Sequence, residues 1–155
     1  MRGSQRRGSG PRINPLSRIL VAWLPVLLFE ALVMFVSSRP NLTIPGHIPS
    51  ADKLAHTVEY AILGMLLFRA LRQSGLSRFR AILLTVALAA GLGGSDELFQ
   101  RSIPGRTCSI WDWTADLTGA TLGSFSMYRI EYRVPSRFWW LGLSKSHADT
   151  EREFG

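Results

Sequence analysis

The sequence contains very little cysteine, and this shortage excludes several kinds of chemistry. Cys108 is the only cysteine among 155 residues, so the chain has neither an intrachain disulfide framework nor a thiolate metal site. Ser95, Ser102 and Cys108 are nucleophilic side chains near a group of acidic residues. None of them has a base in a triad-like context, so the sequence gives no indication of nucleophilic catalysis.

Charged residues are also scarce, and most of them are basic. They make up 19% of the chain and leave a net charge of +7 at pH 7. A basic chain of this kind either binds nucleic acid or lies in a membrane with its basic side inside. Here the charges cluster between long apolar runs, and 46% of the residues are hydrophobic. The pattern favours a single-domain membrane protein whose partner is the lipid bilayer and not nucleic acid.

Four segments are predicted to form transmembrane helices. Residues 19–37 and 79–95 are apolar almost throughout, and the first is long enough to cross a hydrocarbon core of ~30 Å. Residues 52–71 and 111–128 are polar near their start and apolar later. A membrane tolerates such helices when their polar stripes face protein instead of lipid. The sequence therefore predicts an all-α integral membrane bundle of four transmembrane helices.

Basic residues orient this bundle because basic loops stay in the cytoplasm. Both termini and the connection near residues 72–80 are therefore predicted to be cytoplasmic, and loops 38–51 and 98–110 are predicted to lie outside. The basic residues that decide this are Arg2, Arg6, Arg7, Arg12 and Arg18 before the first helix, Arg69, Arg72, Arg78 and Arg80 around the second connection, and Arg129, Arg133, Arg137 and Lys145 after the fourth helix.

The first apolar run could also belong to a cleaved signal peptide. Its basic start fits, but it is longer than the usual ~7–15-residue apolar region, it contains Glu30, and no small-residue cleavage site follows. We therefore predict an uncleaved helix. Residues 1–17 are predicted to be a flexible basic segment, 18–130 the four-helix membrane domain, and 131–155 a cytoplasmic tail that is interfacial at first and then disordered.

Polar residues from three predicted helices should meet at the outer membrane face. The second helix starts outside, the third ends outside and the fourth starts outside, and spacings of three or four residues place the polar groups on one face of each helix. These residues are Asp52, Lys53, His56, Glu59 and Tyr60 on the second helix, Asp96, Glu97 and Gln100 on the third, Asp112 and Asp116 on the fourth, and Arg106 in the loop between the last two.

This cluster can be a functional site or a structural lattice of salt bridges. Crowded carboxylates repel one another and need partners such as Lys53 and Arg106. In a functional site, His56 is the candidate acid–base group, and Glu97 and Asp112 are its partners or cation ligands. Arg106 is then a clamp for phosphate or carboxylate. The many oxygen ligands point to Mg²⁺ or Ca²⁺ as a possible cofactor, and a lone histidine argues against a His-rich zinc site.

Two further features lie within the predicted helices. Gly119 and Gly123 form a small-xxx-small pattern, which predicts close approach of a neighbouring helix. Glu30 lies well inside the first helix. An acid at that depth is either functional or bonded to another helix.

The stretch SDELFQRSIPGRTCSIWDWTADLTGATLG, residues 95–123, closely resembles the VanZ-like signature, in which D-E-x-x-Q leads to P-G-R and then to D-x-x-x-N-x-x-G. LVMFVSSRP is similar to the family's first-helix ending, and DKLAHTVEYAILGMLLFRAL is similar to its second-helix motif D-K-x-x-H-x-x-x-Y. Together these segments span residues 19–128. Asp116 stands where the family pattern often has asparagine, so an amide-based role is not carried over to this position.

The resemblance implies a small multi-pass protein of the bacterial plasma membrane with a role in the cell envelope. The family's founding member is linked to resistance against teicoplanin, a glycopeptide that acts outside the cell on peptidoglycan precursors. The outer polar cluster would then bind or act on an envelope component, such as a lipid or a peptidoglycan precursor. Two alternatives stay open, a small transporter or flippase subunit and a non-catalytic membrane partner protein whose cluster is structural.

Overall fold

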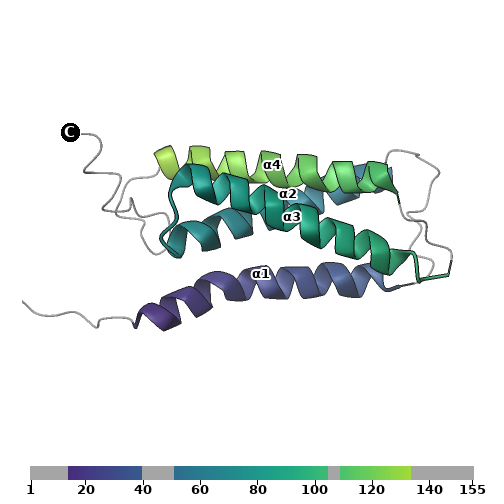
Figure 1. The fold of residues 1–155 in the computed structure, drawn as a ribbon, viewed down its shortest axis with the longest axis horizontal. Coiled ribbons are helices and arrows are strands. Elements are labelled where there is room, and N and C mark those ends of the chain that lie inside the picture. Colours follow the sequence, from purple (N-terminus) through teal and green to yellow (C-terminus); the bar gives the residue numbers. More distant parts are fainter. Residues whose placement is uncertain (1–13, 40–50, 105–108, 134–155) are drawn as a thin grey trace, which may run out of the picture.

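The computed structural model describes residues 14–39, 51–104 and 109–133. These residues form four α-helices, which are α1 (Pro15–Ser37), α2 (Ala51–Gln73), α3 (Arg78–Gln100) and α4 (Ile110–Arg133). The helices lie side by side, and each runs opposite to the one before it (Figure 1). The predicted all-α bundle of four helices is therefore confirmed.

The alternating directions give the bundle two distinct ends. One end holds the last turns of α1 and α3 and the first turns of α2 and α4 (Figure 1). We call it the polar end and define it by His56, Glu97 and Asp112. The opposite end is defined by Arg72 and Glu131, which lie near the last turns of α2 and α4.

Local sequence explains how the helices begin and turn. The side chain of Asn14 accepts a hydrogen bond from the backbone nitrogen of Leu16 at 3.1 Å, and Pro15 occupies the first turn, where a missing N–H costs nothing. Helix α1 thus begins inside the segment 1–17 that was predicted to be flexible. Gly75 closes α2 with φ of 92°, a left-handed conformation that glycine adopts without a steric penalty. Helix α4 likewise includes residues 131–133, the first part of the predicted tail 131–155. Residues 1–13 and 134–155 lie outside the described residues.

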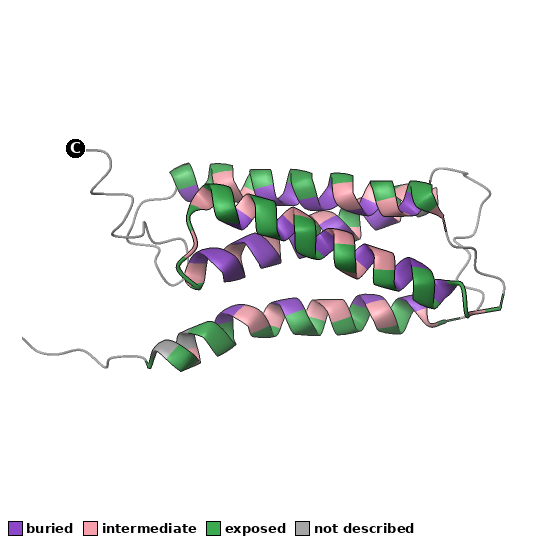
Figure 2. Cartoon of the chain, in the orientation of Figure 1, coloured by how far each residue is buried: buried purple, intermediate pink, exposed green. Residues whose placement is uncertain are grey.

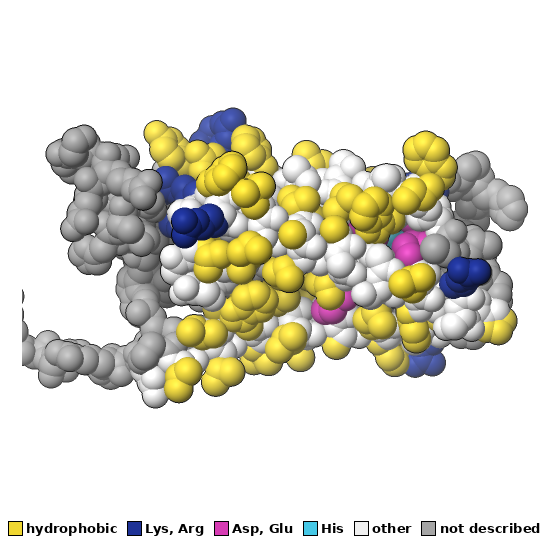
Figure 3. Space-filling model, viewed as in Figure 1, with side chains coloured by type: hydrophobic (Ala, Val, Ile, Leu, Met, Phe, Trp, Pro, Cys, Tyr) yellow, Lys and Arg dark blue, Asp and Glu magenta, His cyan; other side chains and the backbone are white. Residues whose placement is uncertain are grey.

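Three of the described helices are long and apolar enough to cross a membrane, over residues 19–37, 53–73 and 78–100. Most of the large exposed side chains of these helices are apolar, whereas five of the seven acidic residues whose burial is described are buried. Figure 2 shows the buried and exposed positions along each helix. On the face drawn in Figure 3, Lys and Arg lie toward the two ends and hydrophobic side chains cover much of the length between them. Helix α3 continues past its apolar run to Gln100, in agreement with the predicted placement of Asp96, Glu97 and Gln100 on this helix. There Asp96 and Gln100 contact Ser37 of α1.

Glycines bring α2 and α4 into the closest contact in the bundle. A Cβ atom on Gly119 would lie 2.2 Å from the carbonyl oxygen of Thr57, and one on Gly123 would lie 2.0 Å from that of Ala61. No side chain fits at such distances, so the two backbones touch only because these residues are glycines. The predicted close approach is confirmed, and it fixes the position of α4 against the polar face of α2.

Candidate functional site

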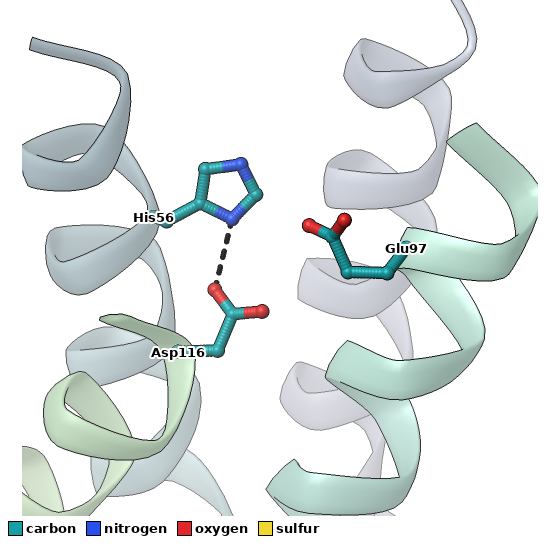
Figure 4. A group of neighbouring side chains, drawn as sticks. All are labelled: His56, Glu97 and Asp116. Atoms are coloured by element: carbon teal, nitrogen blue, oxygen red, sulfur yellow. Dashed lines mark hydrogen bonds and ion pairs between the residues drawn. The ribbon is translucent and has the colours of Figure 1, made fainter. Parts of the chain in front are cut away.

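The centre of the polar end is a buried pair between α2 and α4. His56 on α2 is 6% exposed and Asp116 on α4 is fully buried. The Nδ1 atom of His56 lies 2.9 Å from Oδ1 of Asp116, which is hydrogen-bond distance (Figure 4). Asp116 lies one turn before Gly119, so the close α2–α4 contact brings its carboxylate to the imidazole.

Glu97 approaches this pair from α3. Its Oε2 atom accepts a hydrogen bond from the backbone nitrogen of Ser109 at 2.6 Å, and its side chain points toward His56 and Asp116 (Figure 4). One potential ligand atom from each of the three residues lies within 4.8 Å of the other two. We call His56, Glu97 and Asp116 the buried trio.

Two carboxylate oxygens of the buried trio have no hydrogen-bond partner among the described residues. They are Oε1 of Glu97 and Oδ2 of Asp116, and both are fully enclosed by protein. A buried polar atom without a partner is costly, and a charged one is more so. The trio therefore has unused acceptor capacity that only a further group could satisfy.

Gly93 makes room for Asp116. A Cβ atom at Gly93 would lie 2.8 Å from Oδ2 and 3.3 Å from Cβ of Asp116. Contacts this short displace a side chain. The glycine on α3 thus allows the carboxylate to occupy its present position between α2 and α3.

Lys53 and Asp112 form a separate ion pair at the rim of the polar end. The Nζ atom of Lys53 lies 2.8 Å from Oδ1 of Asp112, and the two side chains are 44% and 9% exposed. The expectation that Lys53 neutralises one of the crowded carboxylates is confirmed. Asp112 is therefore paired with a lysine, while the buried trio contains two acids and a single histidine.

Asp96 and Gln100 belong to another group, which connects α3 to α1. Oδ2 of Asp96 accepts hydrogen bonds from the Ser37 hydroxyl at 3.3 Å and from Nε2 of Gln100 at 3.1 Å. Nε2 of Gln100 also lies 3.4 Å from the Ser37 hydroxyl oxygen. Sequence reasoning missed Ser37, because a serine at the end of an apolar run gives no distinctive signal.

The other candidate residues lie apart from these contacts or outside the described side chains. Tyr60 is completely buried and its hydroxyl has no hydrogen-bond partner, whereas Glu59 is half-buried. Glu30 is half-buried on α1, with its Oε2 atom enclosed and without a partner. Asp52 lies in the first turn of α2, but its side chain is outside the described part of the chain, as is the whole of Arg106.

The opposite end holds a buried ion pair that sequence reasoning missed. Nε and Nη2 of Arg72 lie 3.0 Å and 2.8 Å from Oε1 of Glu131, and Nη1 donates to the carbonyl oxygen of Leu76. Nε of Arg78 is 3.8 Å from Oε2 of Glu131. The available signal was an acid near the end of α4 close to several arginines. This group connects α2, α3 and α4.

The chemistry available at the polar end follows from these contacts. An imidazole held by a carboxylate can transfer a proton, because its partner fixes the ring and stabilises its charged form. The same imidazole with two carboxylates offers one nitrogen and two oxygen donors to a cation. The rim pair of Lys53 and Asp112 adds a partly exposed cationic group beside them.

Comparison with known protein families shows where the chain belongs. The family described as VanZ/LLP1 matches residues 4–131, which is most of the chain and covers α1 to α3 and all but the last two residues of α4. No curated protein and no solved structure matches the chain.

Proposed function

Because the chain belongs to the VanZ/LLP1 family of membrane proteins, we propose that it holds the polar head group of a cell-envelope lipid at the outer face of the bacterial plasma membrane. The observation that carries this proposal is that a buried histidine and two buried acids from three helices converge at one end of the bundle. Ionisable groups at such positions are expensive, and they mark substrate or ion sites by default.

The proposal includes α4 as a fourth transmembrane helix. Its 24 residues extend about 36 Å, more than the hydrocarbon core requires. Its acids are buried, and its exposed positions include Trp111, Leu122 and Phe125. The exposed hydroxyls of Thr118 and Thr121 donate to backbone oxygens of their own helix at 2.8 Å and 2.7 Å, so they do not require water. These features support contact between α4 and lipid.

In this arrangement, the residues of the polar end have separate tasks. Lys53, the exposed Arg101 and Arg106 attract a phosphate or carboxylate, because cationic donors bind such groups strongly. His56, oriented by Asp116, supplies or removes a proton on the bound head group. A lipid whose tail lies against the apolar helices would present its head group at this level of the bundle. A phosphate-bearing peptidoglycan precursor lipid fits these requirements.

The proposed orientation predicts that Cys108 is reached from outside the cell. A membrane-impermeant maleimide should label it in intact spheroplasts, because loop 98–110 lies outside in the proposed topology. Cys108 is outside the described residues, but as the only cysteine it has no competitor. The measurement is the mass shift of the purified chain after labelling.

The matched control moves the cysteine to the other side. Ser77 is exposed on the α2–α3 connection and its side chain makes no capping hydrogen bond, so Ser77→Cys combined with Cys108→Ser should fold normally. This variant should be labelled only after the cells are permeabilised. If Ser77→Cys is labelled in intact spheroplasts and Cys108 is labelled only after permeabilisation, the polar end lies in the cytoplasm and the proposed orientation is wrong.

The proposed head-group binding predicts selective recognition of phosphate. The purified full-length chain in phosphatidylcholine nanodiscs should bind a long-chain isoprenyl diphosphate and not the corresponding isoprenyl alcohol. Lys53→Gln with Arg106→Gln should weaken this binding by at least about tenfold, since each charge-assisted hydrogen bond contributes roughly 1.5–3 kcal/mol. Equal binding of the diphosphate and the alcohol would contradict the proposal.

A resistance-type role follows if the lipid is a peptidoglycan precursor. Expression of the chain in a teicoplanin-susceptible bacterium should raise the inhibitory concentration of teicoplanin. His56→Ala and Glu97→Ala should remove this effect while the protein still inserts and keeps its thermal stability. If these variants lose insertion or thermal stability to the same extent as they lose the resistance effect, the cluster is a structural lattice of salt bridges. If the wild-type chain leaves susceptibility unchanged, the resistance-type role is wrong.

A further inference from the structure

We propose that His56, Glu97 and Asp116 form a three-ligand site for an octahedral divalent cation of the Mn²⁺ class. This inference deepens the proposed function, on which it rests, by naming the cation through which the polar end would hold a phosphate. With the cation bound, His56 acts as a ligand and no longer as the proton-transfer group.

The donors come from three helices and converge on one point. Each residue of the buried trio offers a ligand atom within 4.8 Å of the others, and all three side chains are at least nine-tenths buried. Two donors on adjacent corners of an octahedral cation with bonds of about 2.1 Å lie about 3 Å apart. The 2.9 Å between Nδ1 of His56 and Oδ1 of Asp116 shows that the imidazole and this carboxylate already lie about that close. The ligand atom of Glu97 lies within 4.8 Å of the other two, so Glu97 would move inward when a cation binds.

Two carboxylate oxygens that lack a hydrogen-bond partner among the described residues lie in the trio. They are Oε1 of Glu97 and Oδ2 of Asp116, and both are buried. Both side chains point toward the space between them in Figure 4. A cation satisfies both oxygens at once.

The charges of the described residues also favour a cation. Asp112 has Lys53 as its partner, and Glu131 has Arg72 at the far end of the bundle. Within the described part of the chain, the two acids of the trio share one histidine, which carries at most one positive charge. A divalent cation with a neutral imidazole balances the two carboxylates, and burial strengthens this interaction.

The donor set indicates which class of cation fits. Ca²⁺ takes six to eight oxygen ligands, and Mg²⁺ binds mainly through oxygen, whereas the trio supplies one nitrogen and two oxygens. Mn²⁺ accepts carboxylates and also binds more firmly than Mg²⁺ where an imidazole contributes. Three protein donors leave three octahedral positions for water or for phosphate oxygens. The expected cation thus shifts from the Mg²⁺ or Ca²⁺ that oxygen content alone suggests to the Mn²⁺ class.

The test uses Mn²⁺ alone, without any lipid probe. The full-length chain is purified into phosphatidylcholine nanodiscs, freed of metal with a chelator and titrated with Mn²⁺ while the signal of free Mn²⁺ is followed by electron paramagnetic resonance. We expect one tightly bound Mn²⁺ per chain, with weaker competition from Mg²⁺. Glu97→Gln and Asp116→Asn should each weaken binding by at least about tenfold, the lower range for damage to a metal's surroundings.

Two matched pairs separate ligation from general effects. Glu59→Gln removes the same charge as Glu97→Gln from a half-buried residue outside the trio, so it should keep most of the affinity. Gly93→Ala alters no donor but pushes against Oδ2 of Asp116, so it should weaken binding, whereas Gly91→Ala has open space and should not. If a ligand variant fails to fold, the comparison of Gly93→Ala with Gly91→Ala still tests the cation site, because neither substitution removes a donor.

The outcomes also distinguish this proposal from the proposed function. Absence of a stoichiometric Mn²⁺ in the wild-type chain, or equal losses in Glu59→Gln and Glu97→Gln, would reject the cation site. If the isoprenyl diphosphate still binds when a chelator is present, head-group recognition stands and only the cation is rejected. If Mn²⁺ binds but the diphosphate does not, the cation site stands and the proposed lipid is wrong.

Discussion

Glu131→Gln is expected to lower the free energy of unfolding by about 3–5 kcal/mol, the cost of breaking a buried ion pair by removing one partner. The side chains of Arg72 and Glu131 are 3% and 1% exposed and lie 2.8 Å apart. Removing the carboxylate's charge leaves the Arg72 guanidinium buried without its counterion. The measurement is reversible unfolding of the purified chain in mixed micelles, followed by circular dichroism.

Two comparisons test this explanation of the Glu131 effect. Arg133→Gln changes an exposed charge on the same helix and should alter stability by no more than about 0.5 kcal/mol. The double variant Arg72→Met with Glu131→Leu should recover most of the loss, because well-packed apolar groups can replace a buried pair. A loss in Glu131→Gln no larger than that in Arg133→Gln would mean that water reaches this end and screens the charge.

Gly123→Ala is expected to destabilise the bundle by at least about 3 kcal/mol, the upper end of the usual cost of overpacking a core. The added Cβ would lie 2.0 Å from the carbonyl oxygen of Ala61. Backbone atoms cannot rotate away as a side chain can, so α4 must move away from α2. This movement also separates Asp116 from His56, so the variant should lose function together with stability.

Gly91→Ala is the matched control for Gly123→Ala. A Cβ atom at Gly91 has nothing within 4 Å, and alanine is favoured over glycine in a helix by about 1 kcal/mol. This variant should therefore be as stable as the wild type or slightly more stable. If both substitutions have the same effect, then the close contact of α2 with α4 does not hold the bundle together.

The general plan of the molecule could be read from the sequence because it depends on local pattern. Long apolar runs predict helices, and residues three or four apart share a helical face whatever surrounds them. This reasoning located His56 on α2, Glu97 on α3 and Asp116 on α4, and it identified the glycine pattern on α4. The VanZ-like motifs along residues 19–128 also predicted the family, which the match to residues 4–131 confirms.

The pairing of these groups required the tertiary structure. Asp112 and Asp116 lie on one stripe of α4, yet one pairs with Lys53 and the other with His56. Asp96 and Glu97 are neighbours in sequence, but they face different helices. Spacing tells which residues share a face, but the choice of partner depends on how each helix is rotated against the others.

The sequence by itself determined the four helices, the family and the helix on which each described residue of the polar end lies. Only the tertiary structure decided that His56, Glu97 and Asp116 form a buried trio with two unused oxygens, and that Glu131 pairs with Arg72. The physical reason is that helix formation follows from neighbouring residues along the chain. Helix rotation and separation depend on contacts such as Gly123 on Ala61 and Gly93 beside Asp116, which join residues distant in sequence.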